Sequence, residues 1–179
     1  MPSGLLGNQV LTAGADTVVY TVPPSKYSVC TLVLCNRNIA LPAISASQSG
    51  TTATITSSVS WNFVSGNIVT ISGIGFPWDG TYTITVTNSF TFTYTVATSN
   101  VVGTFATSGT ISPISKIKVA IAASITPVNA EYIEYDSNLE VSSQIERTGL
   151  VLDAGKRVII NSSMNNVTAV CHGIEATIA

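Results

Sequence analysis

The strongest constraint on the fold is an alternation of apolar and polar residues with a period of two. Residues 90–96 read Phe-Thr-Phe-Thr-Tyr-Thr-Val, so the aromatic rings share one face and the threonines share the other. Residues 116–122 alternate lysines with isoleucine and valine in the same way. Because no segment has a convincing helical period, the sequence predicts an all-β protein.

The distribution of charge predicts two domains. Asp79 is the one charged residue between Pro42 and Ser115, whereas the other fifteen charged residues lie outside this window. The window is also crowded with serine and threonine. Such an abrupt shift indicates domain boundaries, so we expect a discontinuous outer domain, residues 1–41 and 113–179, with an inserted domain, residues 42–112.

The outer domain has the strand spacing of an antiparallel β-sandwich, either jelly-roll or immunoglobulin-like. Turn residues, among them Pro23-Pro24 and Asn36-Arg37-Asn38, separate its apolar runs. The expected strands are residues 17–22, 27–34, 116–122, 132–135, 145–152, 156–160 and 167–175. We expect the third of these to be the hairpin partner of the second, with the insertion in place of the turn.

The inserted domain is predicted to be a small β-sandwich or barrel. Its expected strands are residues 51–56, 67–72, 80–86, 90–96 and 103–107. Inward-facing aromatic rings would supply its core.

The scarcity of charge indicates a protein that packs against other proteins. Charged residues make up 9% of the chain, against a usual share of about 25%. Interface cores are depleted in charge, so we expect other proteins and further copies of the chain as partners, in a homo-oligomer such as a trimer. The alternative is a hydroxyl-rich surface without an obligate partner.

Several other partners and locations are not expected. The chain has no basic run that would contact nucleic acid, and its apolar stretches are too short to span a membrane. Its N-terminus lacks the pattern of a signal peptide, which predicts synthesis in a cytosol.

Catalysis is not expected either, and neither is a cofactor or a metal. His172 is the one histidine, and no nucleophile elbow, Walker loop or dinucleotide fingerprint occurs. Cys30, Cys35 and Cys171 read as small buried apolar residues, because their number is odd and the first two would face opposite sides of a strand. Paired carboxylates of a glycan hydrolase are a remaining alternative, and the candidates are Glu131, Glu134, Asp136 and Glu140.

Candidate interaction residues fall into two sets. Residues 2–15 suit an extended arm that becomes ordered on binding, and Glu146-Arg147 suits a charged strand edge or half of an intersubunit ion pair. The apolar residues of the arm are Leu5, Leu6, Val10 and Leu11. In a rival interpretation, a carbohydrate-binding adhesin, an exposed aromatic platform would consist of Trp61, Phe76 and Trp78.

Two sets of short motifs stand out along the chain. The outer motifs are Val19-Tyr-Thr-Val-Pro23, Leu34-Cys-Asn-Arg-Asn38, Lys118-Val-Ala-Ile-Ala122, Tyr132-Ile-Glu-Tyr135 and Glu146-Arg-Thr-Gly-Leu-Val-Leu152. The inner motifs are Ala53-Thr-Ile-Thr56, Val69-Thr-Ile-Ser-Gly73, Asp79-Gly-Thr-Tyr-Thr-Ile84 and Phe90-Thr-Phe-Thr-Tyr94. With these motifs the outer domain resembles small structural proteins of tailed bacteriophages, particularly those that infect cyanobacteria, and the inserted domain resembles a β module of phage tail, baseplate and fibre proteins. Ser60-Trp61-Asn62 stands where the module usually has His-Gly-Leu.

The resemblance implies a location and a set of partners. It implies a virion protein, assembled in the host cytoplasm, that decorates or joins the capsid, neck or tail. Other virion proteins would be its partners, and a host-surface glycan is a further possible one.

Overall fold

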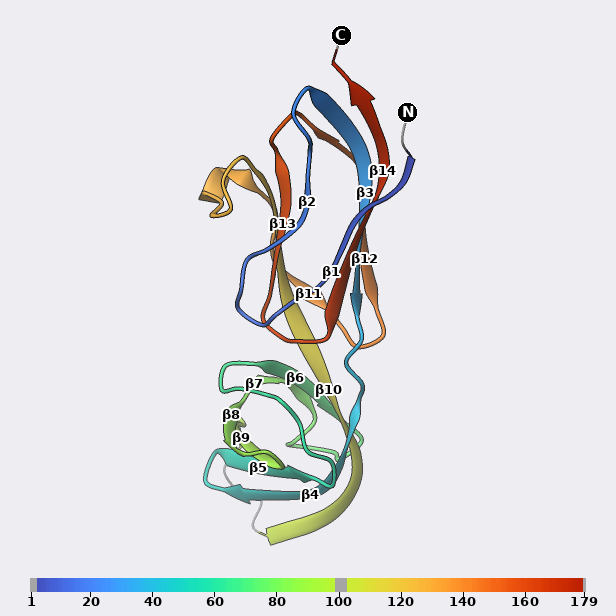
Figure 1. Ribbon diagram of the computed structural model, residues 1–179. Coiled ribbons are helices and arrows are strands. Elements are labelled where there is room, and N and C mark those ends of the chain that lie inside the picture. The colour runs from blue at the N-terminus through green and yellow to red at the C-terminus, as the bar shows by residue number, and fades with distance from the viewer. Residues whose placement is uncertain (1–2, 99–102, 179) are drawn as a thin grey trace. The chain divides into compact units, whose positions relative to one another are not determined.

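The protein is built from antiparallel β-strands in two compact units. The computed structural model describes residues 3–98 and 103–178 (Figure 1). Unit 1 is Met1–Asn38 with Ser115–Ala179, and unit 2 is Ile39–Ile114. Within the described residues the helical structure is one 3-10 turn, Asn129–Glu131, so the prediction of an all-β protein is confirmed.

Unit 1 is a sandwich of two sheets with four strands each. The first sheet has the order β1-β14-β3-β12, and these strands are Ser3–Val10, Val167–Thr177, Lys26–Asn36 and Gln144–Leu152. The second sheet has the order β2-β13-β10-β11, in which β2 is Thr17–Thr21, β13 is Arg157–Ser162 and β11 is Tyr132–Leu139. Its third member is the C-terminal part of β10, which spans Gly103–Ala122.

The pairing of the strands in unit 1 is nested. β1 pairs with β14, β2 with β13, β3 with β12 and β10 with β11. The first strand of unit 1 therefore pairs with the last, the second with the second to last, and so on towards the middle of the chain. Eight strands in two sheets with this connectivity form a jelly roll. The predicted antiparallel sandwich is therefore correct, and the jelly roll is the alternative that is present.

The core of unit 1 lies between its two sheets. Alternate residues of β3, including Cys30, Leu32 and Leu34, are at most 2% exposed and pack on Val119 and Val158 of the second sheet. Gly7 of β1 lies where a Cβ atom would collide with the carbonyl oxygen of Val19, so a side chain there would force β1 away from β2.

The expected hairpin between residues 27–34 and 116–122 is wrong. β3 pairs with β12 and β14 in the first sheet, whereas β10 pairs with β13 and β11 in the second. The insertion therefore lies in a connection that crosses from one sheet to the other. Sequence alternation shows that both segments are strands, but it does not choose their neighbours.

Unit 2 is a small barrel. Its remaining strands are β4 (Leu41–Ser49), β5 (Thr52–Ser57), β6 (Ile68–Ser72), β7 (Gly80–Thr83), β8 (Thr85–Asn88) and β9 (Thr91–Thr95). The order is β7-β6-β10-β4-β5-β9-β8. Only Ile84 separates β7 from β8, so one continuous segment pairs with both ends of this series and closes the barrel.

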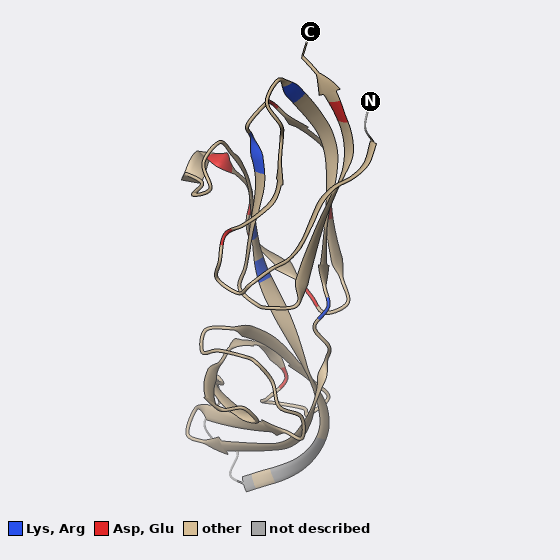
Figure 2. Ribbon diagram, in the orientation of Figure 1, with Lys and Arg blue, Asp and Glu red and all other residues tan. Residues whose placement is uncertain are grey.

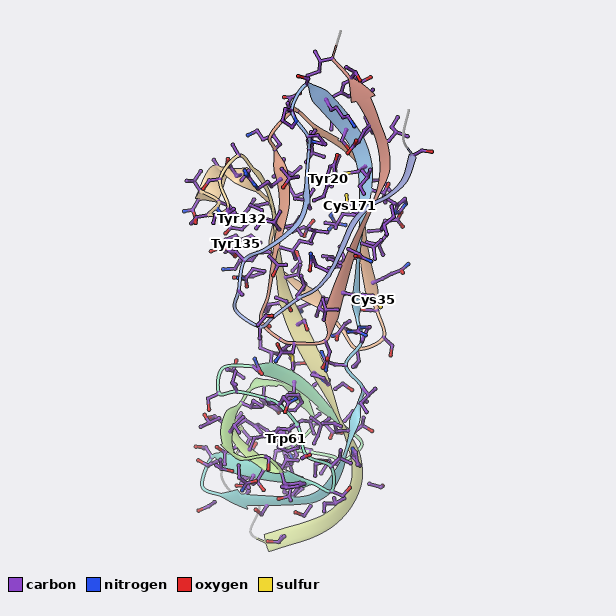
Figure 3. The ribbon with its side chains drawn as sticks, in the orientation of Figure 1. Tyr20, Cys35, Trp61, Tyr132, Tyr135 and Cys171 are labelled. Carbon is purple, nitrogen blue, oxygen red and sulfur yellow. The ribbon has the colours of Figure 1, made fainter. Side chains whose placement is uncertain are left out.

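Aromatic side chains fill the barrel of unit 2. Phe92, Tyr94, Trp61 and Trp78 are buried there with aliphatic residues of the surrounding strands. Figure 3 shows Trp61 among the side chains inside this unit. The sequence did not predict β4, and it predicted one strand over residues 80–86 where the structure has β7 and β8.

Candidate functional site

The outer face of the first sheet is the candidate functional site, and we call it the docking face. Its side chains alternate along each strand with those of the core, because successive residues of a strand point to opposite sides. The docking face consists of Leu5, Asn8 and Val10 on β1; Thr168, Val170, His172 and Ile174 on β14; Tyr27, Val29, Thr31, Val33 and Cys35 on β3; and Gln144, Glu146 and Val151 on β12.

Strand register arranges these side chains in rows. One row crosses the sheet from Ile174 through Val29 to Val151, so three β-branched side chains lie side by side. In another row, His172 lies between Leu5 and Thr31. Val151 is 66% exposed and Leu5 is 63% exposed. The docking face therefore leaves aliphatic carbon in contact with water.

The docking face is also almost free of charge. Glu146 on the edge strand β12 is its one acidic residue, and it contains no lysine or arginine. Figure 2 shows where the charged residues of unit 1 lie on the ribbon. Covering this face with a partner would remove few charges from water, so the electrostatic cost of desolvation would be low.

A shallow hollow lies at the β1 edge of the docking face. It is lined by Asn8, Gln9 and Val10 of β1 and by Thr168, Ala169 and Val170 of β14. These residues are direct partners across the strand pair. None of them is charged, so the hollow suits an uncharged, largely apolar group.

The predicted arm is a strand of the sandwich. Residues 3–10 pair with β14 as β1, and Pro2 lies outside the described residues. Leu5 and Val10 are on the docking face, while Leu6 is half-buried against the core. Leu11 is 2% exposed, which makes the prediction that it contacts a partner wrong. A sequence with few charges does not distinguish an edge strand from a free arm.

Glu146 and Arg147 have different surroundings. Glu146 is exposed on the docking face, whereas the Arg147 Nε donates to Glu134 Oε1 at 2.5 Å within the same chain. Arg147 therefore has an ion partner inside its own chain, and an intersubunit ion pair through Glu146-Arg147 stays a prediction. Hydrogen bonding from Ser137, together with Arg147, lowers the pKa of Glu134. A carboxyl held ionised in this way is poorly suited to act as a general acid.

The expected aromatic platform does not exist. Trp61 is 8% exposed and Trp78 is 6% exposed, because both rings belong to the core of unit 2. Trp61 stacks on Phe63 with ring centroids 5.2 Å apart. Phe76 is 81% exposed and is the one member of the predicted set that a partner can reach. An interior that needs large rings explains the tryptophans without a ligand.

A second cluster of aromatic and charged side chains lies on β10 and β11. Tyr132 and Tyr135 meet edge to face with centroids 5.2 Å apart (Figure 3). The Lys118 Nζ lies 4.3 Å from the centroid of the Tyr135 ring and 3.7 Å from Asp136 Oδ1. The lysine therefore makes a cation–π contact with one face of the Tyr135 ring and an ion pair with Asp136 on the surface of unit 1.

The sequence did not reveal a buried polar cluster at one end of the sandwich. Glu175 is 9% exposed and accepts hydrogen bonds of 2.7 Å from the Tyr20 hydroxyl and the Lys26 Nζ. The lysine and then the tyrosine lower the pKa of Glu175. This cluster joins β2 to β3 and β14, which makes it a structural link between the two sheets.

The three cysteines have no disulfide partner. Cys30 and Cys171 are buried in the core of unit 1, as expected for small apolar residues. Cys35 is half-buried on the docking face.

Comparison with known proteins gives no family. No protein-family model and no curated protein matches the chain. One solved structure is similar at low level: the VP16-VP17 complex, a complex of the two major capsid proteins of bacteriophage P23-77. The identity is 12% over 95% of this chain and 92% of that chain, with a TM-score of 0.20, which does not establish a shared fold. In the described ranges 3–98 and 103–178, no helix has the length and hydropathy to cross a membrane.

Proposed function

We propose that the protein is a non-enzymatic structural subunit of a tailed-phage virion, which decorates or joins the capsid, neck or tail. The observation that carries the proposal is the docking face, where rows of valine, isoleucine and leucine are exposed almost without charge. A surface of this kind is stabilised when another protein covers it. The partner would be another virion protein or a second copy of the chain.

The fold supports this proposal by analogy. Viral capsid domains and lectins both use the jelly roll, so the fold alone does not choose between assembly and sugar binding. The chain favours assembly, because Trp61 and Trp78, two of the three members of the aromatic platform expected for an adhesin, are buried in the core of unit 2. The motifs that resemble small phage structural proteins point in the same direction.

Binding to purified particles tests the proposal. Mass spectrometry of particles from the virus that encodes the chain should detect it, and tagged protein should cosediment with particles made without it. Val151→Arg places a charge on the docking face at a site that is 66% exposed, so the fold tolerates the change. We expect this variant to bind particles at least about tenfold more weakly, because the buried charge would have no partner.

The matched control is Ile133→Arg, on β11 of the second sheet, where the side chain is 43% exposed. This variant should bind like the wild type. Absence of the chain from particles, or equal binding by Val151→Arg and the wild type, would refute the proposal.

A further inference from the structure

Phe76 is an apolar side chain held out into solvent by a fixed loop. Its exposed fraction of 81% is the highest among the large apolar side chains of the described residues. The Asp79 carboxylate accepts hydrogen bonds from the backbone N–H groups of Gly73 at 3.1 Å and Ile74 at 2.9 Å. The N–H of Trp78 donates to the Gly75 carbonyl at 2.9 Å.

Both ends of this loop are also attached to the interior of unit 2. Trp78 is a buried member of the core, and Ile74 packs partly against it. The loop therefore does not need to become ordered when Phe76 is covered, which lowers the entropic cost of binding. Aromatic residues, phenylalanine among them, are enriched at protein interfaces.

The chemistry around Phe76 restricts what can cover it. Residues 42–115 contain no lysine or arginine, so unit 2 lacks the basic residues that would help one aromatic ring to hold a bilayer. Asp79, the one charged residue between Pro42 and Ser115, uses its carboxylate to accept the backbone hydrogen bonds that hold the loop, so the feature that Phe76 offers to a partner is an apolar ring. A concave, uncharged protein surface would suit such a ring.

The chain itself has such a surface. The hollow between β1 and β14 is lined only by uncharged residues, and Val10, which is one of them, is 58% exposed. Val10 and Val170 offer carbon to an aromatic ring, and the amides of Asn8 and Gln9 can bond to the carbonyl groups of an incoming loop. Both surfaces are neutral, so no charge would be left unpaired where they meet.

We propose that Phe76 of one copy inserts into the hollow of a second copy. The contact uses two different surfaces and is therefore heterologous. In an open dimer, one copy keeps a free Phe76 loop and the other keeps a free hollow, so further copies can add until a ring closes. This inference rests on the proposed function, since the hollow is part of the docking face, and it names a second copy as the partner there.

A mixing experiment tests the heterologous contact. Phe76→Ala removes the ring but keeps the hollow, and Val10→Arg fills the hollow with a charged side chain but keeps the ring. Sedimentation velocity should show concentration-dependent association of the wild type, and each variant alone should dissociate about 30-fold more readily. An equimolar mixture of the two variants should form a one-to-one dimer that grows no further, because one complete contact remains.

Two matched variants keep the experiment specific. Phe90→Ala removes another exposed phenylalanine of unit 2, 43% exposed, and Ile133→Arg adds the same charge on β11, outside the docking face, where the side chain is also 43% exposed. Both should associate like the wild type. Circular dichroism should show that all four variants are folded.

Several outcomes would overturn the inference. These are a monomeric wild type at high concentration, association that survives both Phe76→Ala and Val10→Arg, or a mixture that stays monomeric. Insertion of Phe76 into the hollow of its own chain would be independent of concentration and would also contradict it. Particle binding separates this result from the proposed function: a monomeric protein that still cosediments with particles, and loses this binding on Val151→Arg, refutes only the contact between copies.

Discussion

The Tyr20 hydroxyl donates a hydrogen bond of 2.7 Å to the Glu175 carboxylate, and this bond connects the two sheets of the jelly roll. Tyr20 is on β2 of the second sheet, and Glu175 is on β14 of the first. Burial, and then the hydrogen bond to Glu175, raise the pKa of Tyr20 to about 12. The tyrosine therefore remains a neutral donor at every physiological pH.

Removing this donor should destabilise unit 1. In Tyr20→Phe the Glu175 carboxylate keeps Lys26 but loses its bond to β2. Hydrogen bonds to charged groups contribute about 1.5–3 kcal/mol, and we expect the free energy of unfolding to fall by that amount. Urea unfolding followed by circular dichroism measures the change. Tyr27→Phe, at a side chain 39% exposed, is the control, and an equal loss in both variants would contradict the role of the bond.

Stability should decrease in acid because of two carboxyl groups. The pKa values of Glu175 and Glu134 are lower in the folded chain than in a free glutamate. The folded state then binds fewer protons, so its stabilisation is complete above the unfolded pKa of about 4.3 and is lost as the pH falls through the lower folded value. Urea unfolding at a series of pH values should show this decrease. Glu175→Gln should flatten it, whereas Glu146→Gln, at an exposed residue, should leave the slope unchanged.

A methyl group at Gly7 should disturb the contact between β1 and β2. The added Cβ atom would collide with the Val19 carbonyl oxygen, which is backbone and cannot rotate away. Gly7→Ala should lower the free energy of unfolding by about 1–3 kcal/mol, as other overpacked sites do. Asn8→Ala, at the next and exposed residue, should change it by less than about 0.5 kcal/mol. A thermal melt of Gly7→Ala that matches the wild type would show that β1 can shift without cost.

Tryptophan fluorescence should report on unit 2. Trp61 and Trp78 are the two tryptophans of the chain, and both are buried in that unit. We expect emission at short wavelength in the folded state and little quenching by acrylamide. Phe76→Ala should leave the emission unchanged, because the exposed ring is not part of that core. Emission at the longer wavelength typical of tryptophan in water would contradict the burial of both side chains and would support the hypothesis of an exposed aromatic platform.

Local pattern predicted most of the strands, although it missed β1 and β4. The period-2 alternation of residues 90–96 and 116–122 reappears in β9 and β10, where Phe92, Tyr94, Ile117 and Val119 are buried. The absence of charge from residues 42–115 also coincides closely with unit 2, which the contacts place at Ile39–Ile114.

Long-range partners were not predictable in the same way. Alternation is identical whether β3 pairs with β10 or with β14, because the choice depends on the whole chain and not on either segment. The aromatic residues of unit 2 were misassigned for a related reason: Trp61, Phe76 and Trp78 look alike in sequence, and only the closed barrel shows that two of them fill it. The sequence pointed to two residues of the docking face, Leu5 and Val10. The larger part of this face, on β3 and β14, could be recognised only from the register of the paired strands.

The pairing of Leu41 with Ile111 inside unit 2 has a consequence for the order of folding. A long insertion between β3 and β10 would normally slow the closure of the jelly roll, since the entropy lost on joining two chain ends increases with the length between them. Once unit 2 has folded, its own hydrogen bonds hold these two ends as neighbours, and the effective length of the connection becomes short. Unit 2 can also form before residues 144–177 leave the ribosome. The inserted barrel would then bring the two chain segments that flank it in sequence close together before unit 1 folds.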